Sequence, residues 1–302
     1  MDGKISNLQQ IASVRRYTVD SGREQGIKVI DCDNGSLRFL LNESKALDIM
    51  QLYHKGQNVS FLSKNAFVKS ELPFLRRFEG GMLYTCGLDC AGKREGHEQH
   101  GTFHNLPADV ITAYADSEGI AVQAVIRDTQ LFGKNLVMKR RISAKQGADT
   151  LTLTDTLTNE GYNDENYCLL YHINIGYPML DDGCVIIADI EEYEARGDYA
   201  KETASDMLKI TDAVPNQRET CYFLDLRTPK IALENKKLGK RFELTYSGDT
   251  LTDFIEWTSM ASGDYALGFE PSTTKLTEKF VYKTLAPGAS VEFSFNIKIS
   301  EI

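Results

Sequence analysis

Alternation of apolar and polar residues with a period of two dominates this chain, and it predicts strands rather than helices. The clearest example runs from Leu151 to Thr158, where leucine alternates with threonine or aspartate. We expect the leucines on one face of a strand and the threonines and the aspartate on the other. Residues 27–41 form a second signature, because Asn34-Gly35 between two β-prone runs is typical of a hairpin turn.

Further strands are predicted throughout the chain, at residues 46–53, 59–62, 120–127, 136–142, 167–175, 185–188, 222–226, 242–246, 254–259, 266–269 and 291–299. Helical signal is sparse, and Tyr199 to Ile210 is the best candidate. A parallel sheet would need crossover helices that are not predicted here. The pattern therefore indicates an all-β fold, a large antiparallel β-sandwich with little helix. No repeat, linker or change in composition divides residues 1–302, so we expect a single domain.

Composition narrows the classes of partner. The net charge of -9 and the absence of a basic stripe argue against a nucleic-acid partner. No apolar run approaches membrane-spanning length, and the N-terminus lacks the apolar core of a signal peptide. The six cysteines are scattered through apolar runs. We therefore expect reduced, buried cysteines in a cytoplasmic protein.

Glu270 is the first candidate for chemistry. It follows the apolar run from Tyr265 to Phe269, and Pro271 is expected to end the strand directly after it. A carboxylate held by rigid backbone among apolar neighbours acquires a raised pKa, which suits a general base. The alternative is an ordinary solvated glutamate at the end of a strand.

His172 is the second candidate, within the apolar run from Leu169 to Pro178. Alternation places His172 and Asn174 on one face and Tyr171, Ile173 and Ile175 on the other. A polar face in so apolar a segment indicates the floor of a pocket, where an imidazole can donate a proton to an ether or ring oxygen. A core histidine bonded to a backbone carbonyl would give the same pattern.

Residues 80–107 contain three of the five histidines and several glycines. Gly80, Gly81 and Gly101 predict backbone that comes close to a small polar ligand. Possible zinc ligands occur in or near this stretch, at Cys86, Cys90, His97, His100 and His104. Their spacing matches none of the usual ligand patterns, so no metal is predicted. His97, among charged residues, is expected in a solvated loop.

Trp257 and Arg76-Arg77 are weaker candidates. The single tryptophan offers a flat surface on which a sugar can stack, although a lone tryptophan is commonly a core residue. The arginines could donate forked hydrogen bonds to hydroxyls or a carboxylate, or simply form a basic strand edge. The sequence has no GxxxxGK[ST], GxGxxG, GxSxG or HExxH motif. Nucleotide-dependent and serine-hydrolase functions therefore lose support.

Four segments in order resemble the galactose mutarotase-like (aldose 1-epimerase) superfamily, and most closely its uncharacterised DUF4432 branch. They are residues 80–88, 100–108, 171–178 and 265–271. The resemblance implies a β-sandwich with an open cleft that binds a small carbohydrate, a monosaccharide or a derivative. It implies no cofactor.

The resemblance also implies roles for individual residues. Glu270 would be the general base that removes the anomeric hydroxyl proton, and His172 the general acid that protonates the ring oxygen. His100 would hold the sugar near that oxygen. The usual Asn-Arg pair is absent, which leaves Arg77 as the substrate-binding arginine. Asp225 takes the place of the binding aspartate by its order in the chain, and Asn174 and Trp257 complete the predicted sugar-binding set.

The leading hypothesis is thus an enzyme that interconverts sugar anomers by acid–base ring opening and closure. The missing Asn-Arg pair motivates a second hypothesis, a non-catalytic carbohydrate-binding or sugar-sensing protein on the same fold. A metal protein built on the cysteines and histidines is the third. The sequence leaves the identity of the sugar and the oligomeric state open.

Overall fold

The computed structural model describes residues 3–69 and 72–302. Within them the chain forms two antiparallel sheets joined by turns and short helices, which confirms the predicted fold class. The smaller sheet takes five strands in chain order: β1 (Ser13–Thr18), β2 (Lys28–Asp33), β3 (Leu37–Asn42), β4 (Asp48–His54) and β5 (Gln57–Asn58). The predicted hairpin at residues 27–41 is therefore confirmed as β2 and β3.

The larger sheet has thirteen strands, and its main path runs β17-β11-β16-β15-β13-β14-β18-β10-β9-β8-β7, with β6 added to β11 and β12 added to β13. The bounds are β6 (Leu83–Leu88), β7 (Ala108–Ala115), β8 (Gly119–Thr129), β9 (Asn135–Lys145), β10 (Thr150–Asn159), β11 (Glu165–Ile175), β12 (Val185–Ala195), β13 (Thr220–Asn235), β14 (Lys240–Tyr246), β15 (Asp253–Ala261), β16 (Asp264–Ser272), β17 (Lys283–Leu285) and β18 (Ser290–Glu301).

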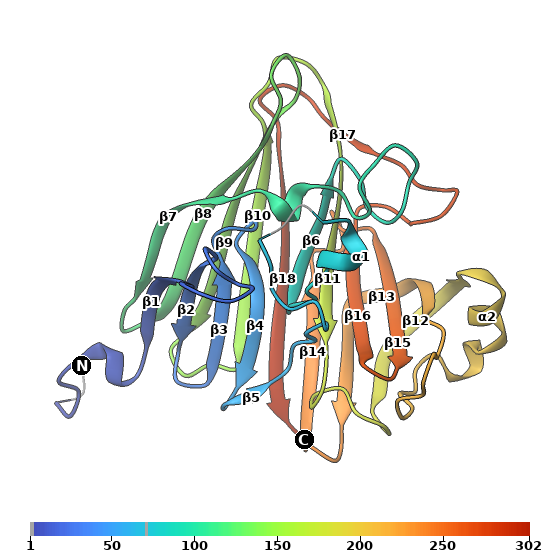
Figure 1. Cartoon of the computed structure of the whole chain (residues 1–302), viewed down its shortest axis with the longest axis horizontal. Coiled ribbons are helices and arrows are strands. Elements are labelled where there is room, and N and C mark those ends of the chain that lie inside the picture. Colours follow the sequence, from blue (N-terminus) through green and yellow to red (C-terminus); the bar gives the residue numbers. More distant parts are fainter. Residues whose placement is uncertain (1–2, 70–71) are drawn as a thin grey trace.

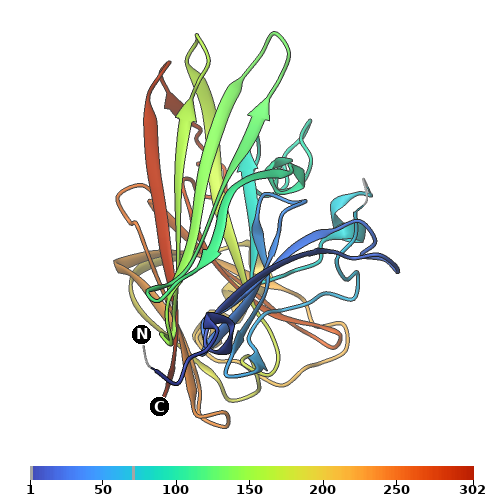
Figure 2. The ribbon, with the colours of Figure 1, turned by 90° about the vertical axis from the view of Figure 1, so that its left-hand side faces the viewer.

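The smaller sheet lies against the half of the larger sheet that contains β7 to β10 (Figures 1 and 2). Side chains of both sheets fill the space between them, for example Phe39 and Leu52 from one and Met138 and Leu153 from the other. The other half of the larger sheet, with β11, β16, β15 and β13, extends beyond the smaller sheet (Figure 1). That half carries the candidate site described below.

One polar residue departs from the predicted alternation of β10. Asp155 lies on the same face as the leucines and is fully buried, whereas the threonines face outward. Its partner is Arg140 of β9, also fully buried, whose Nη2 donates to Asp155 Oδ2 at 2.7 Å. A buried charge persists only when it is paired and hydrogen-bonded. The expectation that Asp155 would share the threonine face was therefore wrong.

Arg140 connects several strands through a single guanidinium group. Its Nη1 donates to the carboxylate of Asp48 on β4, in the smaller sheet, and to the carbonyl oxygen of Ala46 at 2.8 Å. Its Nη2 also donates to Thr85 Oγ1 of β6 at 3.0 Å. The two sheets are thus joined in the core by charge-assisted hydrogen bonds as well as by apolar packing.

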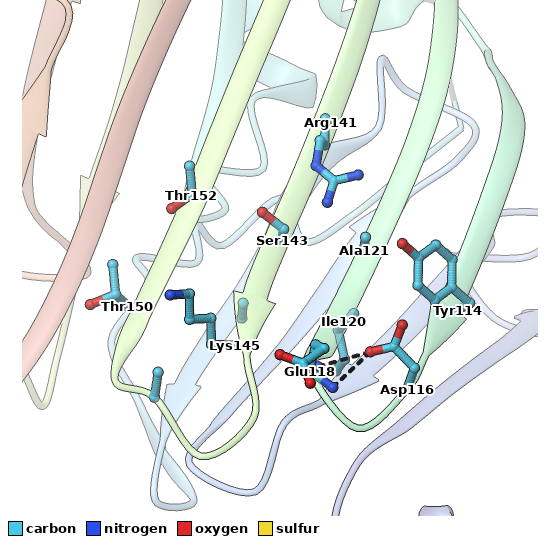
Figure 3. A pocket seen from close by; sticks show the side chains of 13 residues that line it. Tyr114, Asp116, Glu118, Ile120, Ala121, Arg141, Ser143, Lys145, Thr150 and Thr152 are labelled. Carbon is cyan, nitrogen blue, oxygen red and sulfur yellow. Dashed lines mark hydrogen bonds between the residues drawn. The ribbon is translucent and has the colours of Figure 1, made fainter.

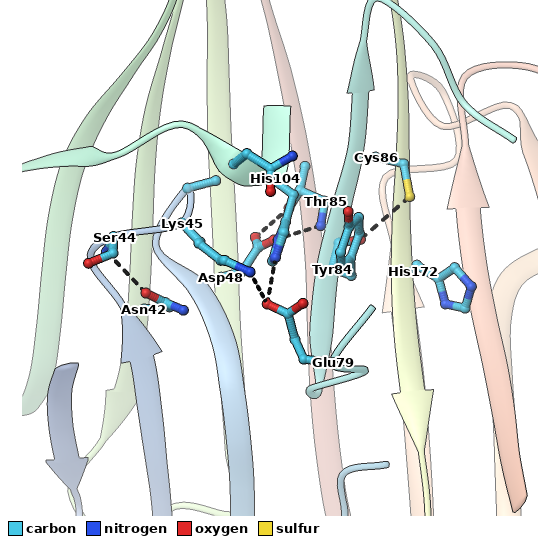
Figure 4. A network of polar contacts seen from close by, with 12 residues as sticks. Asn42, Ser44, Lys45, Asp48, Glu79, Tyr84, Thr85, Cys86, His104 and His172 are labelled. Carbon is cyan, nitrogen blue, oxygen red and sulfur yellow. Dashed lines mark hydrogen bonds and ion pairs between the residues drawn. The ribbon is translucent and has the colours of Figure 1, made fainter. Parts of the chain in front are cut away.

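His104 belongs to the same buried ionic network (Figure 4). Its Nδ1 lies 2.6 Å from Asp48 Oδ2 and its Nε2 lies 2.9 Å from Glu79 Oε1, which also accepts from Lys45 Nζ at 2.7 Å. Burial raises the pKa of the Glu79 carboxyl, but His104 and Lys45 together lower it to about 2. Among the described residues, no group of three or more His, Cys, Asp or Glu side chains is arranged to hold a metal ion. Both ring nitrogens of His104 therefore lie against buried carboxylates of the core.

The predicted helix between Tyr199 and Ile210 is shorter than expected. The structure has α2 (Gly197–Glu202) followed by a 3-10 turn at Ala204–Asp206. Another helix, α1 (Phe74–Arg77), borders the candidate site. All six cysteines are buried and unpaired, as predicted. In the described part of the chain, no helix has the length and apolar character needed to cross a membrane.

Replacing Arg140 with methionine tests the buried network. Arg140→Met leaves Asp48 and Asp155 without their shared cation, so we expect the free energy of unfolding to fall by about 3–5 kcal/mol. Arg141→Met is the matched control, because Arg141 is the next residue but lies exposed on the outer face of the sheet (Figure 3). We expect it to change stability by less than about 0.5 kcal/mol. Urea unfolding at neutral pH measures both, and equal losses would contradict the role of Arg140.

Candidate active site

A cavity of about 670 Å³ lies over the face formed by β11, β16, β15 and β13. His100, His172, Glu270 and Trp257, all predicted site residues, line it together. Its other walls come from the segments around residues 61–65, 74–78, 92–93 and 196 and from residues 217–221. The structure therefore brings together four side chains that are up to 170 residues apart in the sequence.

A second hollow, of about 510 Å³, lies on the outer face of β7 to β10 (Figure 3). Exposed polar side chains line it, including Arg141 and Lys145, and none of the predicted catalytic or binding residues does. Long exposed side chains of this kind have no fixed geometry, since each retains its rotamer freedom. The cavity over β11 and β16 is the better candidate for chemistry.

Strand register places His172 beside Glu270. In the β11–β16 ladder Leu170 pairs with Ser272 and Ile173 pairs with Phe269, so the same register sets His172 directly opposite Glu270. The ladder is interrupted between these pairs, at Pro271, which has no N–H to donate. We predicted that Pro271 would end the strand, but β16 continues to Ser272. The proline instead locally opens the ladder where the two polar side chains meet.

The His172 imidazole and the Glu270 carboxylate are in contact. Nε2 of His172 lies 3.2 Å from Oε1 of Glu270, and both side chains are buried. Gly268, two residues before Glu270 on the same face, leaves room for the pair. A Cβ atom there would lie 2.7 Å from Glu270 Oε1 and 3.2 Å from His172 Cε1.

Burial shifts both pKa values away from the charged forms. It raises the pKa of Glu270 to about 8, with Arg196 lowering and Glu219 raising it to a smaller extent. Burial also lowers the pKa of His172 well below its ordinary value; His100 adds to this effect and Asn174 opposes it. At neutral pH the stable state is thus a carboxylic acid that faces a neutral imidazole.

His100 enters the cavity from the loop between β6 and β7. Its ring centroid lies 5.6 Å from that of His172, and burial lowers its pKa to about 4, helped by Arg196. The adjacent Gly101 has φ +75°, and a Cβ there would lie 2.5 Å from the carbonyl oxygens of Gly87 and Cys90. Gly101 therefore lets the loop pack on its own backbone, not on a ligand as predicted.

Trp257 forms a wall of the cavity edge-on to His172, with 5.5 Å between the ring centroids. Its Nε1 donates to Glu219 Oε2 at 2.8 Å, and Glu219 Oε1 pairs with Arg196 Nη2 at 2.7 Å. The sequence analysis missed Arg196 and Glu219. They flank the paired ends of β12 and β13, where Ala195 lies opposite Tyr222, and β12 had been predicted to end at residue 188.

Three predicted binding residues lie outside the cavity. Arg77 points into a separate cavity and donates to Asn105 Oδ1 at 2.7 Å and to Glu98 Oε1 at 3.0 Å. Asp225 pairs with Lys275 at 3.0 Å. Asn174 is on the predicted face but is fully buried beneath the cavity. Arg77 and Asp225 are each bonded to residues distant in the sequence, so the order of residues along the chain could not show that they lie outside the cavity.

Glu256 shows that a perturbed carboxyl is not enough to define a site. Burial raises its pKa to about 8, as for Glu270, with an opposing hydrogen bond from Thr258 Oγ1 at 3.0 Å. It lies on β15 between Ile255 and Trp257, which line the cavity, so it faces the opposite side of the sheet. Of these two carboxyls, only Glu270 combines the raised pKa with a titratable partner and access to the cavity.

The two sheets and the cavity floor define a galactose mutarotase-like fold. Three solved structures share it. A "putative aldose 1-epimerase" from Klebsiella pneumoniae superposes with a TM-score of 0.88 at 19% identity, covering 95% of this chain and 83% of that one. A galactose mutarotase-like protein from Clostridium acetobutylicum gives 0.73 at 15% identity, with 97% and 100% covered. A galactose 1-epimerase from Lactobacillus acidophilus gives 0.65 at 13%, with 96% and 99% covered.

A family model identifies the chain more closely. The domain of unknown function DUF4432 matches residues 24–299, and the chain belongs to this family. No curated protein matches the sequence. At identities below 20% the structural relatives establish the fold, and the activity has to be argued from the side chains of this cavity.

The raised pKa of Glu256 predicts how stability depends on pH. The folded state holds this proton more tightly than the unfolded state, so the stabilisation is complete below about pH 4.5 and is lost as pH rises towards 8. Glu256→Gln removes the ionisation. At pH 9 we expect the free energy of unfolding of the variant to be several kcal/mol higher than that of the wild type. Each unit by which folding raises the pKa corresponds to about 1.4 kcal/mol.

Urea unfolding at pH 5 and pH 9 measures the effect. Glu292→Gln is the matched control, because Glu292 is exposed on β18. A Glu256→Gln variant whose difference from the wild type is the same at both pH values would show that Glu256 is ionised in the folded protein.

Proposed function

We propose that this protein is an aldose 1-epimerase-like enzyme, which interconverts the α and β anomers of a sugar by opening and closing its ring. The observation that carries the proposal is the contact between Glu270 and His172 at the buried floor of a sugar-sized cavity. The mutarotase-like fold supports it. Ligand pockets of this kind occupy about 300–1,000 Å³, and the cavity falls within that range.

The reaction needs two proton transfers at one carbon. Opening removes the proton from the anomeric hydroxyl and delivers a proton to the ring oxygen, while the bond between the anomeric carbon and the ring oxygen breaks and a carbonyl forms. Both oxygens belong to the same carbon, so a carboxyl and an imidazole 3.2 Å apart can serve them together. Rotation about the neighbouring carbon–carbon bond and closure in the reverse sense give the other anomer.

One transferable proton is enough for the pair. In the resting state it lies on Glu270, because burial favours the uncharged forms of both groups. When it passes to His172, Glu270 becomes the base that accepts the hydroxyl proton, and the imidazolium becomes the acid that protonates the ring oxygen. Each turnover returns one proton to the pair, so no cofactor takes part.

Recognition of the sugar falls to the walls of the cavity. Trp257 offers an aromatic surface against which the C–H face of a sugar packs. His100, Arg196 and Glu219 also line the cavity and offer donors and acceptors for ring hydroxyls. Glu219 bonds to both Trp257 and Arg196, so the three side chains form a connected rim of the cavity, although the Arg196–Glu219 pair is about half exposed and therefore weak.

A second function, carbohydrate binding without turnover, has one observation in its favour. Arg77, the expected substrate-binding arginine, is turned away from the cavity and held by Asn105 and Glu98. A protein of this kind would give saturable sugar binding by calorimetry and no acceleration of anomer exchange.

Substitution of the two central residues tests catalysis. We expect the wild type to accelerate anomer exchange for at least one sugar in a panel of aldoses, measured by NMR exchange spectroscopy. Glu270→Gln and His172→Gln should each lower the acceleration by about 100-fold or more, because each removes one proton-transfer group. Glu256→Gln is the matched control, since it makes the same change in a carboxyl with the same raised pKa on the opposite face of the sheet. Wild-type rates in Glu270→Gln for every accelerated sugar would exclude the mechanism.

The proton count predicts the pH dependence. Above about pH 8 Glu270 loses the shared proton, which leaves a base without an acid, so the enzymatic acceleration should fall about tenfold for each further pH unit. Below the lowered pKa of His172 the pair holds two protons and has no base. Rates corrected for spontaneous exchange should therefore be constant between about pH 6 and 7.5. A rate that keeps rising above pH 8 would show that Glu270 acts alone.

A further inference from the structure

The cavity into which Arg77 points is a second hollow, distinct from the candidate active site. Its volume is about 610 Å³, and it shares no lining residue with the cavity over β11 and β16. The residues that line it come from the segments before β2 and α1, from the β3–β4 connection, from α1 and from the β6–β7 loop. Nothing in the proposed proton transfers uses this cavity.

Two buried cations line the second cavity, although lysine and arginine are rarely buried. Arg77 is 4% exposed and Lys45 is 5% exposed. Among the described residues that line the cavity, three are cationic, Lys45, Lys69 and Arg77, and one, Glu98, is anionic. A cleft with low-dielectric walls and an excess of one charge concentrates ligands of the opposite charge. The cavity therefore favours an anionic ligand.

Lys45 retains hydrogen-bond donors for such a ligand. An ammonium group has three N–H bonds, and in the described part of the chain the Nζ of Lys45 has one partner, Glu79 Oε1 at 2.7 Å (Figure 4). Glu79 does not serve Lys45 alone, because the same oxygen lies 2.9 Å from His104 Nε2. Lys45 is thus held in place by the core network and still has donors to offer.

Glu98 indicates the kind of group that Arg77 binds. Its Oε1 accepts from Arg77 Nη2 at 3.0 Å, while Asn105 Oδ1 accepts from Nη1 at 2.7 Å. The Glu98 side chain is 38% exposed, so its ion pair with the buried guanidinium is partly open to solvent. A guanidinium can bind two oxygens of one carboxylate or phosphate group, and Glu98 contacts only one of its nitrogens. An external oxyanion can therefore replace the Glu98 carboxylate.

We infer that this cavity binds a small molecule with a carboxylate or phosphate group, with Arg77 as the anchor of that group and Lys45 as a second cation. The volume lies in the range of small-molecule sites, about 300–1,000 Å³, and so admits more than a bare ion. Ile27 and Leu72 also line the cavity and offer apolar surface to the rest of the ligand. This site goes beyond the proposed function and does not depend on it.

Calorimetric titration of the whole protein with inorganic phosphate and, separately, with citrate tests the site at constant ionic strength. We expect saturable binding of at least one of these anions, at one site per chain. Binding of phosphate alone would identify a phosphate ligand, and binding of citrate alone a carboxylate ligand. Arg77→Met should weaken the affinity by about tenfold or more, because it removes charge-assisted hydrogen bonds. Arg76→Met is the matched control, since Arg76 precedes it on α1 but is exposed and does not line the cavity.

Glu98→Gln gives a second readout. It removes the carboxylate that competes for Arg77, so the affinity should rise by up to about fivefold, the contribution of a partly exposed ion pair. Glu95→Gln makes the same charge change in the same loop at an exposed position outside the cavity, and should leave the affinity unchanged.

Equal affinities in Arg77→Met and Arg76→Met would overturn the inference, and so would the absence of saturable binding of both anions. If Arg77→Met does not fold, Glu98→Gln decides, because an affinity no higher than that of Glu95→Gln would contradict a site on Arg77. The titrations need no turnover. Absence of epimerase activity would therefore refute the proposed function and leave the anion site standing.

Discussion

A fully buried arginine between two carboxylates is the constraint on which the arrangement of the sheets depends. Arg140 joins β9 to Asp155 on β10 and to Asp48 on β4 of the smaller sheet. Tyr171 OH donates to the same Asp155 at 2.7 Å, and Tyr171 immediately precedes His172 on β11. Such a cluster contributes little net stability over an apolar core, but any shift in register would leave a charge unpaired. The network therefore holds the strand of the candidate site from its rear face.

Local pattern predicted the elements that depend on local chemistry. Alternation placed His172 and Asn174 on one face of a strand, and the apolar run before Glu270 placed it on rigid backbone. It failed for Asp155, which was assigned to the threonine face because it is polar. Its position in the alternation puts it on the leucine face, and the arginine that pairs with it lies on another strand. Arg77 shows the same limit. Its two shorter hydrogen bonds go to residues 21 and 28 positions away, and nothing in its immediate sequence indicates them.

Glu256 and Glu270 lie on adjacent strands, and burial raises both pKa values to about 8. Their difference lies in the direction of the side chain, which the pleat of each strand sets. Arg196 and Glu219 could not be identified from the sequence, because both belong to connecting segments whose meeting depends on the long pairing of β12 with β13. Sequence thus predicted the floor of the cavity better than its walls.

His172 and Glu270 lie on neighbouring strands that are paired on either side of them, so the backbone sets the distance between the two residues. Neighbouring strands keep a spacing of about 4.8 Å, whatever their side chains. Two side chains anchored in this way keep their separation while surrounding residues are exchanged. Apart from Trp257 on β15, the wall residues His100, Arg196 and Glu219 belong to separate connecting segments, which can be altered one at a time. Backbone pairing of this kind tolerates wide changes in sequence, in keeping with a fold that persists among structural relatives that share less than a fifth of their residues with this chain.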